Sequence, residues 1–173
     1  STLWGEDVLA AMRGGQSAEM AVETVTGSDP GRAARQLSAL KCDGDAAAFT
    51  GTGNTDAKGS RLFPGGVVAG NLLSSEAVLD AKVAAFTGST LPFAERLLAA
   101  LRAGEAAGSD SRGLQSAALL VLSPQAPPLT LRIDWSEDPL TDLTALYRRT
   151  TSGDYADWTG QVPTLADPYR QLD

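Results

Sequence analysis

The sequence predicts an α+β protein in which helices pack on an antiparallel or mixed sheet. Strand-like segments follow one another along the 173 residues, and so do helix-like segments, whereas a βαβ protein alternates them. An Asp43-Gly44 pair also stands between two segments of alternating polarity, which is typical of an antiparallel hairpin. With 43% hydrophobic and 20% charged residues, the composition is that of one globular core that needs no disulfide or metal.

Two helices are expected first. The apolar spacing over residues 6–13 predicts a helix that ends at Gly14-Gly15. Ser17 is a suitable N-cap for a second helix over residues 18–26. The expected apolar stripe of this second helix consists of Met20, Ala21 and Val25.

Three strands should follow. Residues 35–42 and 45–50 are expected to pair across the Asp43-Gly44 turn. The polar, glycine-rich residues 50–60 are read as an exposed loop, although their glycines would also let backbone approach a ligand. Residues 66–71 are predicted to form a short buried strand.

The second half begins with two helices, over residues 75–86 and 92–103, the latter stopping at Gly104. A loop then leads into a strand over residues 115–122. We expect a turn at 124–128 and another strand over 129–134.

Asp138 should cap the last helix, with Leu140, Leu143, Leu146 and Tyr147 facing inward. We therefore assign one domain to residues 1–150. Residues 151–173 are an extension whose aromatic residues are expected to pack on the domain or on a partner.

Composition excludes several kinds of chemistry. The chain has no histidine, so it has no Ser-His-Asp machinery and lacks the most versatile metal ligand. A general base must then be a carboxylate, a lysine, a tyrosine or an α-amine. We expect neither a metal nor another cofactor, and the single Cys42 cannot form an intrachain disulfide.

The net charge of −7 arises from acids spread along the chain, which argues against a nucleic-acid partner. The longest apolar stretch, around residues 117–122, is too short to span a bilayer, and the first residues do not resemble a signal peptide. We therefore expect no membrane partner and a cytoplasmic location.

The densest polar cluster, GSDSRGLQSAALL, leads from a loop into a strand and contains Asp110, Arg112, Gln115 and Ser116. These side chains either satisfy one another and the loop backbone or form a binding surface. Asn71 in AGNLL is open to two interpretations as well, as a turn or cap residue or as an amide donor to an oxyanion.

Several segments together resemble the domain-of-unknown-function 1028 family, from Trp4-Gly5 to about Tyr147. The most specific are Gly70-Asn71-x-Leu73, Ala94-x-Arg96-Leu97 and the run from Gly108 to Ala117 that contains Asp110, Arg112, Gln115 and Ser116. That family is grouped with the N-terminal-nucleophile hydrolases. The resemblance implies a four-layer αββα sandwich and hydrolysis of an amide bond in a small molecule.

In such an enzyme Ser1 would be the nucleophile, activated by its own α-amine, and Asn71 would stabilise the oxyanion. Asp110, Arg112, Gln115 and Ser116 would bind the substrate. Family members carry three strands before the segment that matches Ser1–Gly5. We therefore expect a short N-terminal chain from the same precursor to complete the fold, and a homo-oligomer of the processed unit.

Other interpretations stay open at this point. Ser1 is either the nucleophile or a cut end, and the chain is alternatively a non-catalytic binding or assembly subunit. A hydrolase that uses the Asp110 or Glu105 carboxylate is a third reading. The family's cysteine and tryptophan after the Thr-Gly turn are replaced by Asn54 and Ala57, which leaves the role of that loop open.

Overall fold

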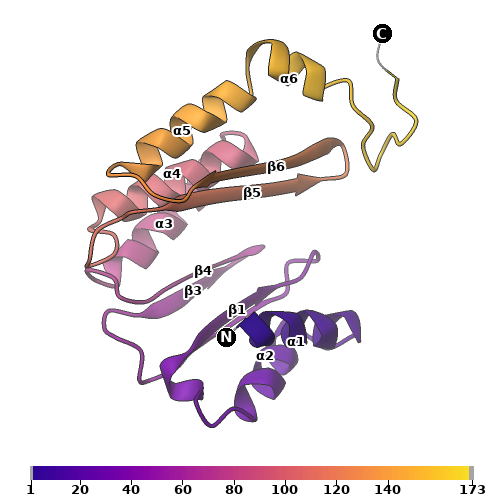
Figure 1. Ribbon diagram of the computed structural model, residues 1–173. Coiled ribbons are helices and arrows are strands. Elements are labelled where there is room, and N and C mark those ends of the chain that lie inside the picture. Colours follow the sequence, from indigo (N-terminus) through magenta and orange to yellow (C-terminus); the bar gives the residue numbers. More distant parts are fainter. Residues whose placement is uncertain (1, 172–173) are drawn as a thin grey trace. The chain divides into compact units, whose positions relative to one another are not determined.

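The computed structural model describes residues 2–171, which fold into two compact units (Figure 1). The first unit comprises the described chain up to Gly88 together with Ala103–Arg112. The second comprises Ser89–Arg102 and the chain from Gly113 onward. The protein is a mixed α/β structure whose described strands pair as three antiparallel hairpins.

The first unit begins with helices α1 (Thr2–Arg13) and α2 (Ala18–Gly27), which pack on the hairpin of β1 (Gln36–Leu40) and β2 (Ala46–Thr50). The Ser17 hydroxyl accepts a 3.2 Å hydrogen bond from the Met20 amide and so caps α2 as predicted. Helix α1 starts earlier than expected. The shared core contains the buried residues Val8, Ala18, Ala21, Val22, Ala39 and Ala47.

Met20 is not part of that core, which corrects the predicted stripe of α2. Its side chain is 57% exposed, while Val22, two residues later, is buried. Ala21 and Val25 do pack against the core, and Val22, which lies about 200° around the helix from Met20, takes the place in the stripe that Met20 was expected to fill.

In the β1–β2 hairpin Leu40 lies opposite Ala46, and the loop is longer than the expected two-residue Asp43-Gly44 turn, so the strand pairing next to the turn differs from the predicted one. The Lys41 amide donates to the Asp45 carbonyl at 2.8 Å, and three residues lie between them. Gly44 has a φ of 92°, as the last position of a three-residue hairpin loop requires.

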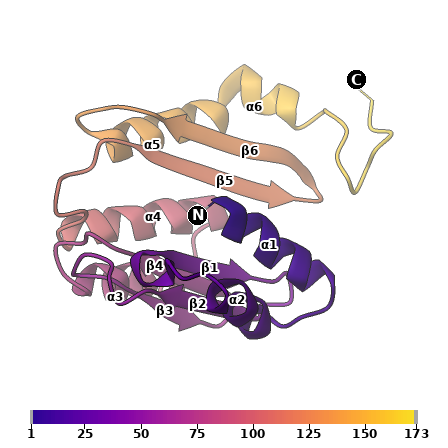
Figure 2. The same ribbon diagram turned by 60° about the horizontal axis from the view of Figure 1, so that its bottom comes forward.

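A second hairpin pairs β3 (Gly59–Phe63) with β4 (Gly66–Gly70). Strand β4 is the short strand predicted over residues 66–71. Strand β3 was not predicted, and its first residues belong to the segment 50–60 that was expected to be a loop. Helix α3 (Ala77–Thr87) contacts this hairpin, and the two hairpins contact each other. The order within the unit is therefore helix pair, hairpin, hairpin, helix (Figure 2).

Helix α4 (Phe93–Ala106) continues through Gly104, where the sequence predicted its end. Gly104 is buried against the side chain of Lys82 on α3. A Cβ atom added to Gly104 would lie 2.2 Å from Lys82 Cε. The glycine is thus explained by the packing of two helices and not by a helix stop.

The second unit contains the hairpin of β5 (Ala117–Ser123) and β6 (Ala126–Ile133), with α4 and α5 (Pro139–Thr150) against one face. The Asp138 carboxylate accepts from the Thr141 amide at 3.1 Å and caps α5 as predicted. Strand β6 begins earlier than expected and includes Pro127 and Pro128. These prolines coincide with a register shift after Val121, where a strand tolerates a missing amide donor.

The C-terminal extension contains a helix that periodicity did not predict, α6 (Gly153–Thr159). Beyond it, the Ala166 amide donates to the Pro124 carbonyl at 2.7 Å, and Thr164 is buried. Leu165 and Tyr169 are more than four-fifths exposed, so these two apolar side chains do not pack on the described residues.

None of the helices within residues 2–171 has the length and apolar character that crossing a membrane requires.

Candidate functional site

Three segments of the first unit meet at Leu73, two residues after Asn71. The Leu73 amide and carbonyl exchange hydrogen bonds with Ala57, and Leu73 also forms a bridge with Asp110. The Ser111 amide donates to the Leu72 carbonyl at 2.8 Å. The structure thereby places the Asn71 segment beside the Asp110 loop, which lies almost forty positions later in the chain.

Two residues at this junction adopt a left-handed backbone conformation. Leu72 has a φ of 57° and Ser109 a φ of 58°, and they are the two described non-glycine residues with positive φ. Such a conformation costs a residue with a Cβ about 1–2 kcal/mol. It persists where surrounding contacts impose it, and functional sites are enriched in such strain.

Asn71 is oriented by Gln36 of β1. The Asn71 Nδ2 group donates to Gln36 Oε1 at 3.0 Å. Gln36 Nε2 in turn lies 2.8 Å from Thr50 Oγ1, 3.1 Å from the Gly59 carbonyl and 3.0 Å from the Gly70 carbonyl. Because an amide nitrogen carries two hydrogens, Asn71 retains one N–H that no described residue engages.

Asp110 is committed to Arg112. Both carboxylate oxygens accept from the guanidinium, at 3.0 Å from Nε and 2.8 Å from Nη2, and the Arg112 backbone amide adds a bond of 2.9 Å. These bonds lower the pKa of the Asp110 carboxyl to about 2. At neutral pH the group is therefore ionised and cannot serve as a general acid or an efficient general base.

The glycine-rich loop closes over the start of β1. Asn54 Nδ2 donates to the carbonyls of Arg35 and Gly51, both at 2.9 Å. The Lys58 ammonium donates to the Asn54 carbonyl and pairs with the Asp56 carboxylate at 2.9 Å. Both Asn54 and Lys58 thus have bonds that fix the loop, which gives Asn54 a structural role.

The beginning of α1 is anchored at the same end of the β1–β2 hairpin as Gln36. The buried Trp4 ring contacts Phe49 edge-on, with ring centroids 6.0 Å apart. The Arg35 guanidinium lies 5.7 Å from the centre of the Trp4 ring. Since Arg35 precedes Gln36 and Phe49 precedes Thr50, the start of α1 and the Asn71 network share one end of this hairpin.

Comparisons with known proteins place the chain in a family. Residues 1–143 match a family described as "Family of unknown function (DUF1028)". The chain belongs to the DUF1028 family. It is also 53% identical to protein SPO2555 from Silicibacter pomeroyi, whose crystal structure is assigned to the same family. That similarity covers 100% of this chain and 75% of the other, with a TM-score of 0.93. No curated protein matches the chain.

The predicted site residues of this DUF1028 chain fall into three groups. Asn71, Asp110 and Arg112 lie in the first unit, where the backbone contacts of Leu72 and Leu73 bring their segments together. Gln115 and Ser116 lie in the second unit, with exposed side chains, and the Gln115 carbonyl accepts from the Ser136 amide. Ser1, the predicted nucleophile, lies outside the described residues.

Sequence reasoning missed Gln36, which orients Asn71, and the Trp4–Arg35 contact. The sequence gives only a weak signal for Gln36, namely a polar side chain within a strand. The partners of this side chain are backbone carbonyls of a different hairpin, which the local sequence does not reveal. Within residues 2–171, no group of three or more His, Cys, Asp or Glu side chains has the arrangement of a metal site.

Proposed function

We propose that this DUF1028 chain is part of an amide-bond hydrolase of the N-terminal-nucleophile type that acts on a small-molecule amide. The observation that carries the proposal is the amide group of Asn71. It is held by Gln36 at 3.0 Å, keeps one N–H that no described residue engages, and directly precedes the left-handed Leu72. A fixed donor of this kind suits a developing oxyanion.

Ser1 supplies the nucleophile in this proposal. Its α-amine, with an ordinary pKa of about 8, takes the proton of its own hydroxyl as Oγ attacks the amide carbonyl. The Asn71 N–H donates to the resulting oxyanion. The amine product leaves with the proton, and water then hydrolyses the ester to release the acid product and the free hydroxyl.

Two features of the first unit support this assignment. Trp4, three residues after Ser1, is anchored at the end of the β1–β2 hairpin that also holds Asn71 through Gln36. The helix, hairpin, hairpin, helix order is also compatible with an αββα sandwich.

The proposal includes the further strands expected from the family, on a short N-terminal chain cut from the same precursor. The homologous chain of known structure extends beyond the part matched here, since this chain covers 75% of it. We further propose that the processed unit is a cytoplasmic homo-oligomer. Intact mass under denaturing conditions, and sedimentation of the native assembly, would test these two points.

The decisive experiment on function is covalent labelling. Treatment of the native protein with a β-lactone should add one acyl group, located at Ser1 by peptide mapping. Replacing Ser1 by Ala should abolish the label. Asn71→Leu removes the oxyanion donor at similar volume, and should slow acylation by about 100-fold or more.

Gln125→Leu is the matched control, because it removes an exposed amide from the β5–β6 turn, where the only described side-chain partner of Gln125 is Ser123. It should label like the wild type. Equal labelling of Asn71→Leu and wild type would contradict the role of Asn71. An absence of any label would favour the alternative function, a non-catalytic binding or assembly subunit.

A further inference from the structure

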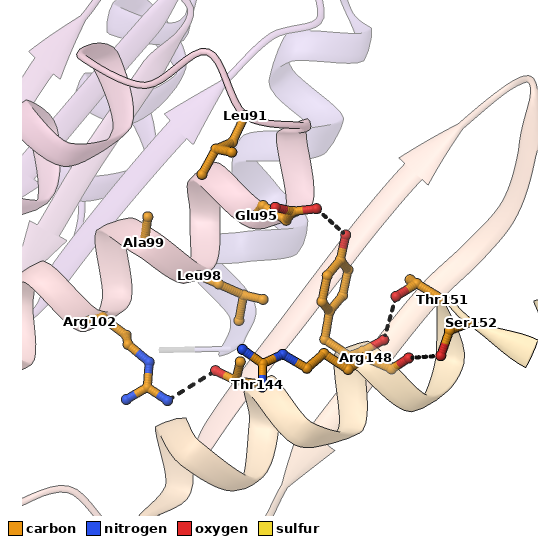
Figure 3. A pocket seen from close by; sticks show the side chains of 10 residues that line it. Leu91, Glu95, Leu98, Ala99, Arg102, Thr144, Arg148, Thr151 and Ser152 are labelled. Carbon is orange, nitrogen blue, oxygen red and sulfur yellow. Dashed lines mark hydrogen bonds between the residues drawn. The ribbon is translucent and has the colours of Figure 1, made fainter.

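A hollow of about 580 Å³ lies between α4 and α5, and all the residues that line it belong to the second unit (Figure 3). Two side-chain stripes of matching period line it, one from each helix. The α4 stripe is Glu95, Leu98, Ala99 and Arg102, and the α5 stripe is Thr144, Tyr147, Arg148 and Thr151. Positions spaced by three, four and seven residues share one face of a helix, so both faces point into the same groove.

One end of this α4–α5 groove is positively charged. Arg102 is fixed there, because its Nη2 group donates to the Leu140 carbonyl at 3.2 Å and to Thr144 Oγ1 at 3.2 Å. Arg148 lies one turn after Thr144, on the same face of α5. Figure 3 draws both guanidinium groups on the side of the groove where Thr144 lies.

The two arginines differ in what they bind. Within residues 2–171, the Arg148 guanidinium forms no hydrogen bond or ion pair, so its planar set of donors is available. A carboxylate matches that geometry, because its two oxygens accept two parallel N–H bonds. The fixed charge of Arg102 adds favourable potential for an anion at the same end.

The rest of the groove limits the kind of anion. Leu91, Leu98 and Ala99 provide an apolar wall, which fits a hydrocarbon body. Glu95, held by the Tyr147 hydroxyl at 3.4 Å, adds one negative charge at the other end. The net charge of the lining is therefore about +1, in a chain of net charge −7, and multiply charged anions are disfavoured.

We propose that the α4–α5 groove is a binding site for a small monocarboxylate with a branched or linear apolar body. The carboxylate pairs with Arg148 beside Arg102, and the hydrocarbon lies on Leu91, Leu98 and Ala99. This site does not depend on the amide hydrolysis proposed above, because its residues are separate from Asn71 and Ser1.

The test is an NMR titration of the purified chain with isocaproate. A ligand of this size in an open groove should bind with a Kd of about 1 mM. Backbone amide shifts should concentrate in residues 91–102 and 144–152. Isocaproamide, the neutral isostere, should bind at least about 10-fold more weakly, since a charge-assisted hydrogen bond is lost.

Arg148→Gln should weaken isocaproate binding by about 10-fold or more. Arg148→Lys should weaken it by less, because lysine keeps the positive charge but cannot donate two parallel hydrogen bonds to the carboxylate. Arg149→Gln is the matched control. It removes the same charge from the next, exposed residue, which does not line the groove, and should leave the Kd unchanged within about 2-fold.

Four results would each overturn the proposal: equal weakening by Arg148→Gln and Arg149→Gln, shifts centred outside the two segments, tighter binding of inorganic phosphate, or no shifts at the solubility limit of isocaproate. Arg148 is exposed, so its variants should fold, and circular dichroism of each variant checks this.

Discussion

Asp110 shows how a residue that resembles a catalytic acid is instead fixed by its neighbour. Its side chain is 23% exposed, whereas that of Arg112 is 68% exposed, so the ion pair lies at the surface of the Leu73 junction. The bidentate ion pair with Arg112 and the hydrogen bond from the Arg112 backbone amide explain the low pKa of Asp110. A carboxylate-based hydrolase that uses Asp110 is therefore disfavoured, and the residue is better understood as a support for the loop.

Replacing Arg112 by Gln should raise the pKa of Asp110 from about 2 toward the ordinary value of 3.8. Because the folded pKa is depressed, this group stabilises the fold above pH 3.8, and the contribution is lost as the pH falls toward 2. Because Arg112 is largely exposed and its charge is screened by solvent, we expect only a small loss of stability at neutral pH. The carbon-13 NMR titration of Asp110 measures the shift.

Arg132→Gln is the control, since Arg132 pairs with Asp134 and both side chains are more than 60% exposed. If the pKa of Asp110 is unchanged in Arg112→Gln, the backbone hydrogen bond from residue 112 is sufficient to lower this pKa, and the guanidinium is not needed.

Lys82 is the opposite case, a cation whose burial lowers its pKa from 10.5. Within residues 2–171 its ammonium has no hydrogen bond or ion pair. Because the folded pKa is depressed, the unfolded chain binds more protons between that value and 10.5, so stability should rise with pH across this window. Lys82→Met should then stabilise the protein at neutral pH by about 0.5–1 kcal/mol, allowing for partial solvent screening.

Urea unfolding at neutral pH and above pH 10.5 tests this, with the advantage of Lys82→Met disappearing at the higher pH. Lys41→Met, which removes a lysine paired with Asp43 at 3.4 Å, should bring no gain. A constant advantage at both pH values would point to packing and not to charge.

At the scale of elements, the crossing of α3 and α4 depends on Gly104. Alanine exceeds glycine in helix propensity by about 1 kcal/mol, so Gly104→Ala would stabilise α4 if space allowed. The added Cβ would instead lie 2.2 Å from Lys82 Cε and 3.0 Å from Cγ. We expect Gly104→Ala to destabilise the wild type and to stabilise a Lys82→Ala background.

A double-mutant cycle by urea denaturation measures this change of sign, with a coupling energy of about 1–3 kcal/mol between the two sites. Additive effects would mean that the Lys82 side chain moves aside without cost.

The junction of the Asn71 and Asp110 segments offers a matched pair of serines. Ser109 has a φ of 58°, whereas Ser111 is not among the residues with positive φ. Ser109→Gly should therefore relieve strain and raise the free energy of unfolding by about 0.5–1 kcal/mol. Ser111→Gly should lower it by a similar amount, because glycine gains entropy in the unfolded chain.

Thermal or urea unfolding of the two variants gives the comparison, and the backbone bonds of both residues are unaffected by the change. Equal destabilisation by both substitutions would show that the left-handed conformation of Ser109 carries no strain.

Elements with local signals were predicted correctly from the sequence. Ser17 and Asp138 cap their helices, and Asp43-Gly44 lies in a hairpin loop, because each of these features is decided by a few neighbouring residues. Strand β3 was missed because its pairing is supplied by β4. Gly104 was taken for a helix stop because the packing of Lys82 cannot be seen in the local sequence.

In the candidate site, too, features decided by neighbouring residues could be predicted and features decided by distant contacts could not. Asn71 and Asp110 could be singled out by residue type and by their place between elements. Their common junction, and the Gln36 side chain that reaches the carbonyls of Gly59 and Gly70, depend on contacts between segments distant in sequence. The family resemblance located the residues, while the hydrogen bonds define how each of them is held.

At the scale of the whole molecule, the hydrophobic core is divided. The two clusters around Val22 and Leu79 lie in the first unit, and the cluster around Leu143 lies in the second, with no residue in common. Helix α4 contributes residues to both units. Separate clusters of this kind are expected to open in separate steps of hydrogen exchange.

Leu143 and Leu79 are both fully buried, which makes them a matched pair of probes. Leu143→Ala should cost about 2–5 kcal/mol and accelerate amide exchange in β5, β6 and α5, while β1 and β2 keep their protection. Leu79→Ala should instead accelerate exchange in α3, β3 and β4, while β5 and β6 keep their protection. Hydrogen exchange followed by mass spectrometry measures both, and a uniform loss of protection in either variant would show that the two units unfold as one cooperative body.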